Sequence, residues 1–473
     1  MTQFSQNQMA VNLLFAKHNP EKVFRIVVFV ALLFSSLCFT LQQMGFEKHS
    51  MLLFVIAGLV LIPAIMKRPI VGLYVLPFIV YVIPAINITG IKVLSLGFFT
   101  CCITLLAAVA AIAFGHTRPK PSWLWLLFIT LLFIHVTYSV AYGALGFTFN
   151  FIQGIVPFLL FSLIVDEESD GRRVLLAWMI AYAVFCFFHM SYAILSHPNH
   201  SLIQALHSIR GERLSSHNPN TLGYIALLYF PLAAVLVGAA KRRLDKLRWV
   251  IVLVPILLIL VFTFSRAAMF GLVMTLGLLF LITTKSIKSR LMLLLISTGI
   301  LLFLFVTWKS INCDWLFQLS FLKAEFGKRL LMISDGLELV PLAPWFGHGM
   351  DISVGTHSYL ASVPAQFGLI LFPLFCLPFV YIIMVSRKLG RHGRSEQVRS
   401  LATGIFIAGL VAVPEALYSI TLSGSGYMQV FWLLMAYLHI SNRELAKSTP
   451  HEVKTLNKSF AYTKAMESLN ASR

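Results

Sequence analysis

Residues 249–284 read WVIVLVPILLILVFTFSRAAMFGLVMTLGLLFLITT, two apolar runs that are separated by a polar break at Ser265 and Arg266. Arg266 is the only charged residue in this stretch. A helix needs about 20 apolar residues to cross a bilayer, with about 17–25 tolerated, and both runs are close to that length. The stretch therefore predicts two membrane-spanning helices joined by a tight turn that carries an arginine.

The rest of the chain repeats this pattern. Of its 473 residues, 58% are hydrophobic and 12% are charged, whereas soluble domains have about 45–50% apolar and about 25% charged residues. This composition excludes a soluble enzyme, a disordered chain, a disulfide scaffold and a nucleic-acid-binding domain. It predicts an all-α polytopic membrane protein with about 12–14 transmembrane helices. Fourteen candidate spans lie near residues 23–41, 51–66, 70–86, 93–114, 123–142, 152–165, 174–195, 222–240, 249–264, 268–284, 291–308, 359–385, 401–416 and 427–440.

The distribution of lysine and arginine predicts the orientation of these spans. With a cytoplasmic N-terminus, 28 of the 37 basic residues fall in cytoplasmic segments, as the positive-inside rule requires. An even number of spans then places both termini in the cytoplasm. The net charge of +19 is therefore mainly a topological signal and does not indicate a nucleic-acid partner. Nine basic residues fall outside: Lys48, Lys92, Arg210, Arg213, Arg266, Lys309, Lys323, Lys328 and Arg329.

Two of the predicted loops outside the cytoplasm are long, at about 196–221 and 309–357. They divide the chain into four predicted parts: N-terminal helices (1–195), a core with both loops (196–385), C-terminal helices (386–440) and a cytoplasmic tail (441–473). In the second loop, apolar residues recur at helical spacing, which predicts a short amphipathic helix on the membrane surface that ends at Pro341 and Pro344. The residues of this pattern are Leu322, Phe326, Leu330, Ile333 and Leu337.

Arginines outside the membrane are the first candidate site residues. Arg266 lies at a membrane boundary, where a charge is unfavourable unless it faces water, a partner or a ligand. The planar guanidinium fork matches phosphate oxygens, so we interpret Arg266 as an anion-binding residue. Arg210, Arg213 and Arg329 are candidates for the same site. The alternatives are a snorkelling Arg266, contacts of Arg210 and Arg213 with lipid head groups, and a surface pair between Arg329 and Glu325.

His357 is the candidate catalytic residue, because it precedes a span and follows a glycine-rich stretch that contains Gly347, Gly349 and Gly355. Histidine exchanges protons near neutral pH, and glycines let a bulky ligand approach the backbone. The alternative is a capping or interface histidine. His348, between two of these glycines, is the weaker candidate. The chain has no nucleotide-binding loop and no metal-ligand spacing, so neither cofactor nor metal is expected.

Four stretches in and around the long loops resemble, in order, the core of the O-antigen ligase/polymerase family of bacterial inner-membrane glycosyltransferases. They are RGERLSSHNPNTLGY, FTFSRAAMFGL, GKRLLMISDGLELVPLAPWFGHGMD and THSYLASVPAQFGLILF, within about residues 205–385. The most specific match is His357-Ser358, nine residues, then Gly368. The ligase pattern continues with Gly, Thr or Tyr three residues later, where this chain has Leu371.

The resemblance implies a metal-independent, inverting membrane glycosyltransferase of the all-helical (GT-C-like) type, with its active site on the periplasmic face of the inner membrane. The implied donor is a glycan on undecaprenyl diphosphate. Arg266, Arg329 and one of Arg210 or Arg213 would then bind the diphosphate, and His357 would activate the acceptor as a general base or sit against the leaving diphosphate.

Three functions remain open. A ligase moves the finished glycan to lipid A–core, which the His357 motif favours. A polymerase joins the chain to the next lipid-linked repeat unit, with or without a chain-length regulator as a partner. A transporter or flippase would need ionisable residues along a midplane path and inverted repeats, and the spans show little of either.

Overall fold

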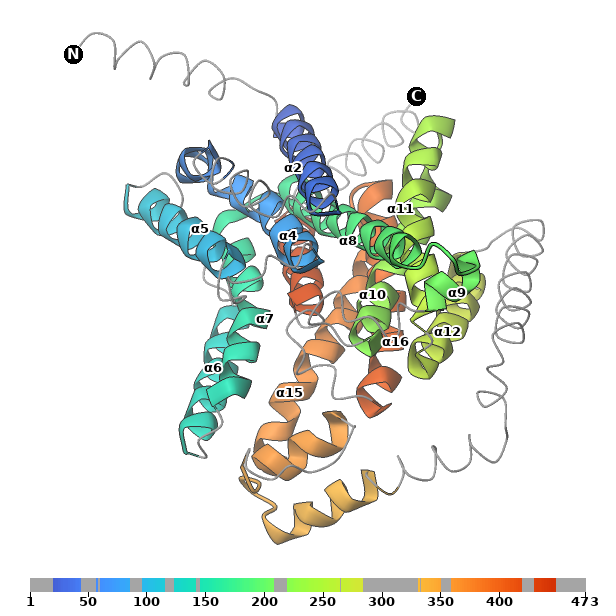
Figure 1. The fold of residues 1–473 in the computed structure, drawn as a ribbon. Helices are drawn as coiled ribbons and strands as arrows, with labels where there is room; N and C mark the ends of the chain where they lie inside the picture. The colour runs from blue at the N-terminus through green and yellow to red at the C-terminus, as the bar shows by residue number, and fades with distance from the viewer. Residues whose placement is uncertain are drawn as a thin grey trace, which may run out of the picture.

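The computed structural model describes residues 20–43, 57, 60–85, 96–114, 123–141, 145–207, 219–263, 265–283, 331, 333–349, 359–418 and 429–447. Within these ranges the chain forms helices and their connections, with no strand (Figure 1). The helices are α2 (Pro20–Gln43), α4 (Pro69–Ala85), α5 (Leu96–Ala113), α6 (Trp123–Ala141), α7 (Leu145–Ile164), α8 (Glu168–Ser196), α9 (Leu202–His207), α10 (Pro219–Ala239), α11 (Arg243–Phe262), α12 (Arg266–Thr283), the 3-10 helix η3 (Val340–Leu342), α15 (Tyr359–His392) and α16 (Glu396–Tyr418). Further helical residues lie at 60–67, 333–339 and 429–447.

Helices overlap thirteen of the fourteen predicted spans, and the remaining one, 291–308, lies outside the described residues. Among the residues described, five helices are long and apolar enough to cross a membrane, and four shorter apolar helices accompany them. The five lie at Trp123–Ala141, Glu168–Ser196, Asn220–Ala239, Ala361–His392 and Glu396–Pro414. The prediction of an all-α polytopic membrane protein is confirmed, while the total of 12–14 spans stays a prediction.

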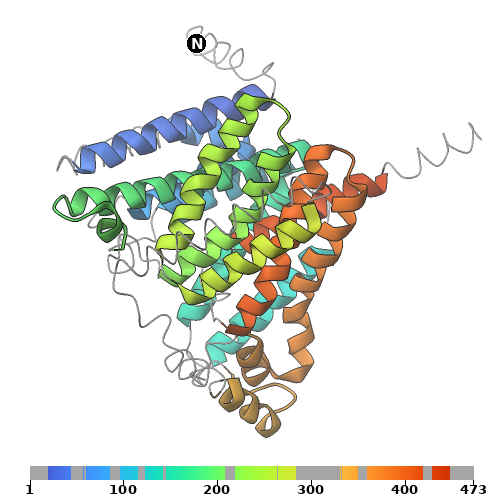
Figure 2. The same ribbon diagram turned by 90° about the vertical axis from the view of Figure 1, so that its right-hand side faces the viewer.

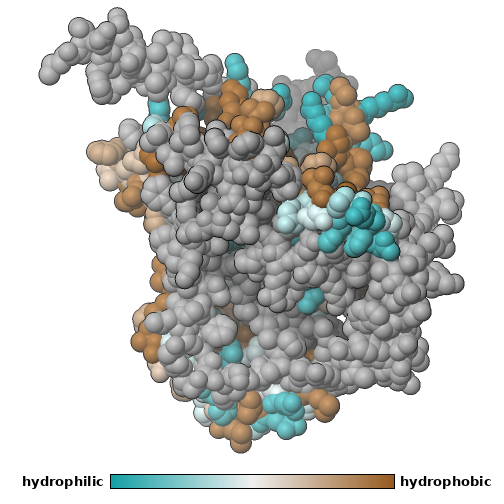
Figure 3. All heavy atoms as spheres, viewed as in Figure 1, coloured by the Kyte–Doolittle hydropathy of each residue, from teal (hydrophilic) through white to brown (hydrophobic). Residues whose placement is uncertain are grey.

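The interior of the molecule is built around α8 and α10, the two most deeply buried of these long helices. α10 packs against α11, α12 and α16, and α8 packs against α4 and α11. α15 and α16 form a hairpin beside them, and α2 and α8 cross the direction of that hairpin (Figure 2). By contrast, α6 exposes much of its apolar surface, seen as brown side chains on the left flank in Figure 3. Such a surface is suited to contact with lipid.

Two buried threonines in these helices donate their hydroxyl to a carbonyl of their own helix. Thr104 Oγ1 donates to the carbonyl of Thr100 at 2.6 Å, and Thr275 Oγ1 donates to the carbonyl of Gly271 at 2.7 Å. A bilayer core offers no water to polar groups, so a threonine or serine inside a span needs such a partner. These polar residues are therefore compatible with helices that cross a membrane.

One end of the molecule is rich in ion pairs that join connections distant in the sequence. We call it the charged end; it contains residues 165–173, 240–248, 387–396 and 441–447, all of which the positive-inside pattern places on the same side. Contacts between these segments are Lys241 Nζ–Glu396 Oε2 at 2.8 Å, Arg394 Nη1–Glu444 Oε2 at 3.6 Å, Arg443 Nη2–Asp166 Oδ1 at 4.0 Å and Glu168 N–Glu444 Oε1 at 2.9 Å.

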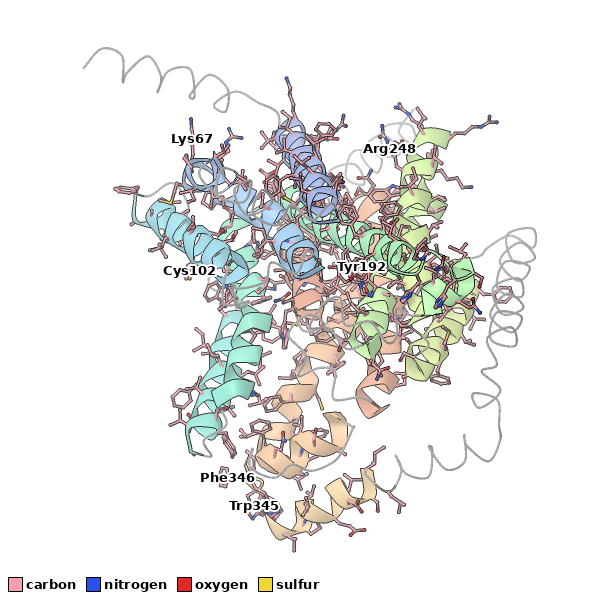
Figure 4. All side chains as sticks on the ribbon, viewed as in Figure 1. Lys67, Cys102, Tyr192, Arg248, Trp345 and Phe346 are labelled. Atoms are coloured by element: carbon pink, nitrogen blue, oxygen red, sulfur yellow. The ribbon has the colours of Figure 1, made fainter. Side chains whose placement is uncertain are left out.

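The last helix continues through residue 447, into the segment 441–473 that the sequence predicts to be a polar tail. Its extension has a local cause, because Arg443 and Glu444 both have partners at the charged end. Lys67 and Arg248 lie towards the upper end of the molecule in Figure 4, whereas Trp345 and Phe346 lie at the opposite end. These basic residues thus lie at the end opposite the exposed aromatic pair, and the orientation of the two ends in the membrane stays a prediction.

Candidate functional site

Most of the predicted site residues lie outside the described residues. These are Arg210, Arg213, Arg329 and His357. For Arg266 the structure describes the backbone but not the side chain. The structure therefore neither brings these side chains together nor separates them. It does describe two elements that adjoin them, the turn between α11 and α12 and the backbone around Gly368.

The turn between α11 and α12 is closed by hydroxyl groups on both sides. Thr263 Oγ1 donates to the carbonyl of Leu260 at 3.0 Å, which completes the end of α11. Ser265 Oγ accepts from the N–H of Ala268 at 3.4 Å, the bond that an N-cap residue makes to the third helical position. Thr263 and Ser265 are only 1% and 4% exposed. Ser265 thus caps α12 and places Arg266 at its first position.

This turn packs closely on the start of α10. A Cβ atom at Gly223 would lie 2.7 Å from Ala268 Cβ and 3.2 Å from Thr263 Oγ1, so only a glycine allows the approach. On the other side of α10, Tyr182 Oη donates to the carbonyl of Leu222 at 2.7 Å. The segment NTLGY at the start of α10 and the segment FSRAA at the start of α12 are therefore neighbours in space.

The electrostatics of this position favour an anion. The N-terminus of a helix carries a partial positive charge, so a cation at the first position of α12 does not stabilise the helix. The first backbone N–H groups of a helix have no partner within the helix, and such groups attract phosphate and carboxylate groups. Arg266 and the N-terminus of α12 would therefore act together on a negatively charged ligand.

The second element is a break in α15, where Gly368 has φ 78° and ψ 171°. The break releases backbone groups that a continuous helix would use. The carbonyls of Ala365 and Gln366 accept from the N–H groups of His348 and Gly349, both at 2.9 Å. In return, the N–H of Leu369 donates to the carbonyl of Pro344 at 2.8 Å. We call this unit, residues 343–349 bonded to 365–369, the clasp.

Three positions of the clasp favour glycine. The φ angles of Gly347, Gly349 and Gly368 are 70°, 83° and 78°, a region that other residues rarely adopt. A Cβ at Gly368 would lie 2.5 Å from Phe346 N, and one at Gly347 would lie 2.6 Å from Gly368 N. Because these neighbours are backbone atoms, they cannot move aside as a flexible side chain would. The glycines of the GHG stretch and of the His357 motif are thus needed in the same contact.

Two side chains fix the clasp to its surroundings. The ring of His348 is hydrogen-bonded through Nε2 to the carbonyl of Leu339 at 2.8 Å, which gives this candidate a structural role. Tyr138 Oη, from α6, donates to the carbonyl of Phe346 at 2.7 Å. Sequence reasoning missed Tyr138, because a tyrosine near the end of a span has many ordinary explanations.

Comparison with known families gives an independent result: residues 251–376 match the family model described as O-Antigen ligase. We call this segment, which is about a quarter of the chain, the O-antigen ligase domain after the family that it matches. The resemblance to this family is thereby confirmed for that segment. No curated protein matches the chain.

The O-antigen ligase domain begins within α11 and ends within α15. It therefore includes both the capped turn at Ser265 and the clasp, whereas Tyr138 and Gly223 come from outside it. Leu371, which departs from the ligase pattern, packs partly buried against the core. Together with the apolar helices, the match supports a multi-pass membrane protein of glycosyltransferase-like ligase or polymerase type.

A metal site is not found among the residues described: no three His, Cys, Asp or Glu side chains lie close enough to hold an ion. The predicted metal independence stays a prediction, since several of the candidate residues lie elsewhere in the chain.

Proposed function

We propose that the protein transfers a glycan from undecaprenyl diphosphate to an acceptor sugar on lipid A–core, at the periplasmic face of the bacterial inner membrane. The observation that carries the proposal is the O-antigen ligase domain, whose capped turn sets an arginine at the N-terminus of α12. A permanent cation beside free N–H groups suits the diphosphate of such a donor.

In the proposed mechanism the leaving group is undecaprenyl diphosphate. The acceptor hydroxyl attacks the anomeric carbon, the glycosidic bond to the diphosphate breaks, and its electron pair leaves on the phosphate oxygen. His357 takes the hydroxyl proton as general base. One direct displacement inverts the anomeric centre.

Arginines stabilise the charge that develops on the diphosphate. We assign this task to Arg266 and Arg329, together with Arg210 or Arg213. Because these cations neutralise the leaving group, the mechanism needs no metal ion. The apolar helices, α6 among them, offer a surface for the polyprenyl tail and the surrounding lipids.

A polymerase is the second candidate, and Leu371 favours it. The ligase pattern has Gly, Thr or Tyr at this position, and the structure packs the leucine against the core. A polymerase would use the same donor, but its acceptor would be a lipid-linked repeat unit, and a chain-length regulator could be its partner. A transporter or flippase gains no support from the ligase domain.

Deletion of the gene, followed by gel analysis of the surface polysaccharide, tests the choice of acceptor. Loss of a ligase leaves polymer on the carrier lipid and unmodified lipid A–core. Loss of a polymerase leaves core that is capped with a single repeat unit. We expect the first pattern, and the second would transfer the assignment to the polymerase.

A further inference from the structure

Tyr138 contacts both sides of the clasp from outside the O-antigen ligase domain. Its hydroxyl donates to the carbonyl of Phe346, on the loop side, at 2.7 Å. Its ring lies 5.1 Å from the ring of Phe367, on the helix side, next to the break at Gly368. His135, about one turn earlier on α6, also packs on Phe367, with ring centroids 5.7 Å apart. One face of α6 therefore supports the clasp.

The loop side of the clasp depends on hydrogen bonds for its position. The two largest side chains of this loop, Trp345 and Phe346, are 65% and 64% exposed and point away from the molecule at its lower end (Figure 4). Side-chain burial thus contributes little to holding these residues. Their backbone is held by the bonds to residues 365–369 and by the hydroxyl of Tyr138.

The clasp also brackets the sequence that contains the proposed general base. Gly349, whose N–H bonds to Gln366, is eight positions before His357, and the helix that leads into the clasp begins two positions after it, at Tyr359. Both flanks of that sequence therefore belong to one hydrogen-bonded unit. A small shift of a catalytic group has a large effect on rate, because catalysis depends on its orientation towards the substrate.

We propose that Tyr138 is a positioning residue for glycan transfer, which acts by holding the clasp against α6. This inference rests on the proposed function and extends it to a residue of the N-terminal helices. Tyr138 does not itself touch the reacting atoms. It maintains the arrangement of the backbone on either side of the catalytic sequence.

The test compares Tyr138→Phe with the matched control Thr137→Val in the full-length protein, purified in lipid nanodiscs. Tyr138→Phe keeps the ring on Phe367 and removes the hydroxyl bond to Phe346. Thr137→Val removes a hydroxyl from the adjacent residue, whose Oγ1 donates within α6 to the carbonyl of Phe133 at 2.8 Å. Two readouts are measured: kcat and KM for transfer from a lipid-linked glycan, and amide hydrogen exchange of residues 343–349 and 365–369.

We expect Tyr138→Phe to lower kcat by about 3- to 10-fold, as the loss of one hydrogen bond allows, with KM changed by less than about twofold. Exchange in residues 343–349 should become faster, while Thr137→Val matches the wild type in both readouts. Wild-type kcat in Tyr138→Phe would overturn the inference, and so would a lower kcat with unchanged exchange. Failure of the proposed function is distinct, because the wild-type protein itself would then transfer no glycan.

Discussion

Arg266 occupies a position where two physical effects oppose each other. A cation at the first position of α12 is unfavourable for the helix, yet the surrounding residues hold this position firmly. Ser265 caps the helix through its hydroxyl, and Gly223 lets α10 approach the turn. The fold thus holds an arginine at a helix terminus that the arginine does not stabilise. Such a position is expected when the arginine binds a ligand.

Replacement of Arg266 tests this interpretation at the level of one residue. We expect Arg266→Ala to reduce transfer by about 10²–10³-fold, the usual effect of losing one group that stabilises developing charge. Arg266→Lys should recover only part of the rate, because lysine lacks the fork that binds two phosphate oxygens. Arg248→Ala, at the charged end, is the control. Near-normal transfer by well-expressed Arg266→Ala would favour a snorkelling arginine instead.

The two histidines of the region should behave differently. His357→Ala should lose nearly all activity, since the proposed general base is absent. His348→Ala should remain active, because the backbone bond of His348 to Ala365 survives and only the ring contact with Leu339 is lost. That loss should lower stability by about 1 kcal/mol. Complementation of a deletion strain, with expression checked by blot, measures the activity of both variants. Full complementation by His357→Ala would contradict the role of His357 as general base.

Among the elements, α15 is the helix whose shape departs most from a simple span. It carries three prolines, Pro364, Pro373 and Pro378, but its backbone leaves the helical conformation at Gly368. The cause is tertiary, because the loop before it supplies partners for the groups that the break releases. The break therefore depends on a segment some twenty residues away as well as on the glycine at position 368.

Gly368→Ala should disrupt this element. An alanine there would adopt a strained backbone, which costs about 1–3 kcal/mol, and its Cβ would collide with the loop backbone. We expect a lower unfolding temperature and strongly reduced transfer. The control is Gly238→Ala in α10, where a Cβ meets nothing within 4 Å and alanine favours the helix. Equal behaviour of the two variants in a thermal unfolding assay would show that the clasp contributes nothing.

The sequence predicts the helices well and their interruptions poorly. Apolar runs reveal the spans because every backbone polar group in a membrane must be bonded within its own segment. The position of Arg266 at a break between two runs was equally visible, and α12 begins there. By contrast, the bond from Tyr138 to Phe346 joins residues 208 positions apart, and no periodicity or motif records such a contact.

At the scale of the whole molecule, the two ends differ in what holds them together. The charged end joins four connections through ion pairs, including Lys241–Glu396 and Arg394–Glu444. The opposite end contains the clasp, with exposed Trp345 and Phe346. Topology rules place basic residues on the cytoplasmic side and aromatic residues at the membrane boundaries, so we predict that the charged end faces the cytoplasm.

Cysteine labelling in intact cells tests this orientation. In a variant without native cysteines, cysteines at Ser216 and Ser334 should react with an impermeant reagent from the periplasm, because both lie in the predicted long loops. A cysteine at Ser289 should react only after the membrane is permeabilised. Labelling of residue 289 in intact cells would show that the predicted orientation or the predicted spans are wrong.

We propose that this protein catalyses glycan transfer with its own side chains. The most direct measurement is transfer by the purified protein in liposomes, from an undecaprenyl-diphosphate-linked glycan to lipid A–core, in the presence of excess EDTA. We expect that the acceptor gains the glycan, that EDTA does not slow the reaction, and that Arg266→Ala transfers the glycan about 10²–10³-fold more slowly. Absence of transfer by the wild-type protein, or transfer that requires added Mg²⁺, would contradict it.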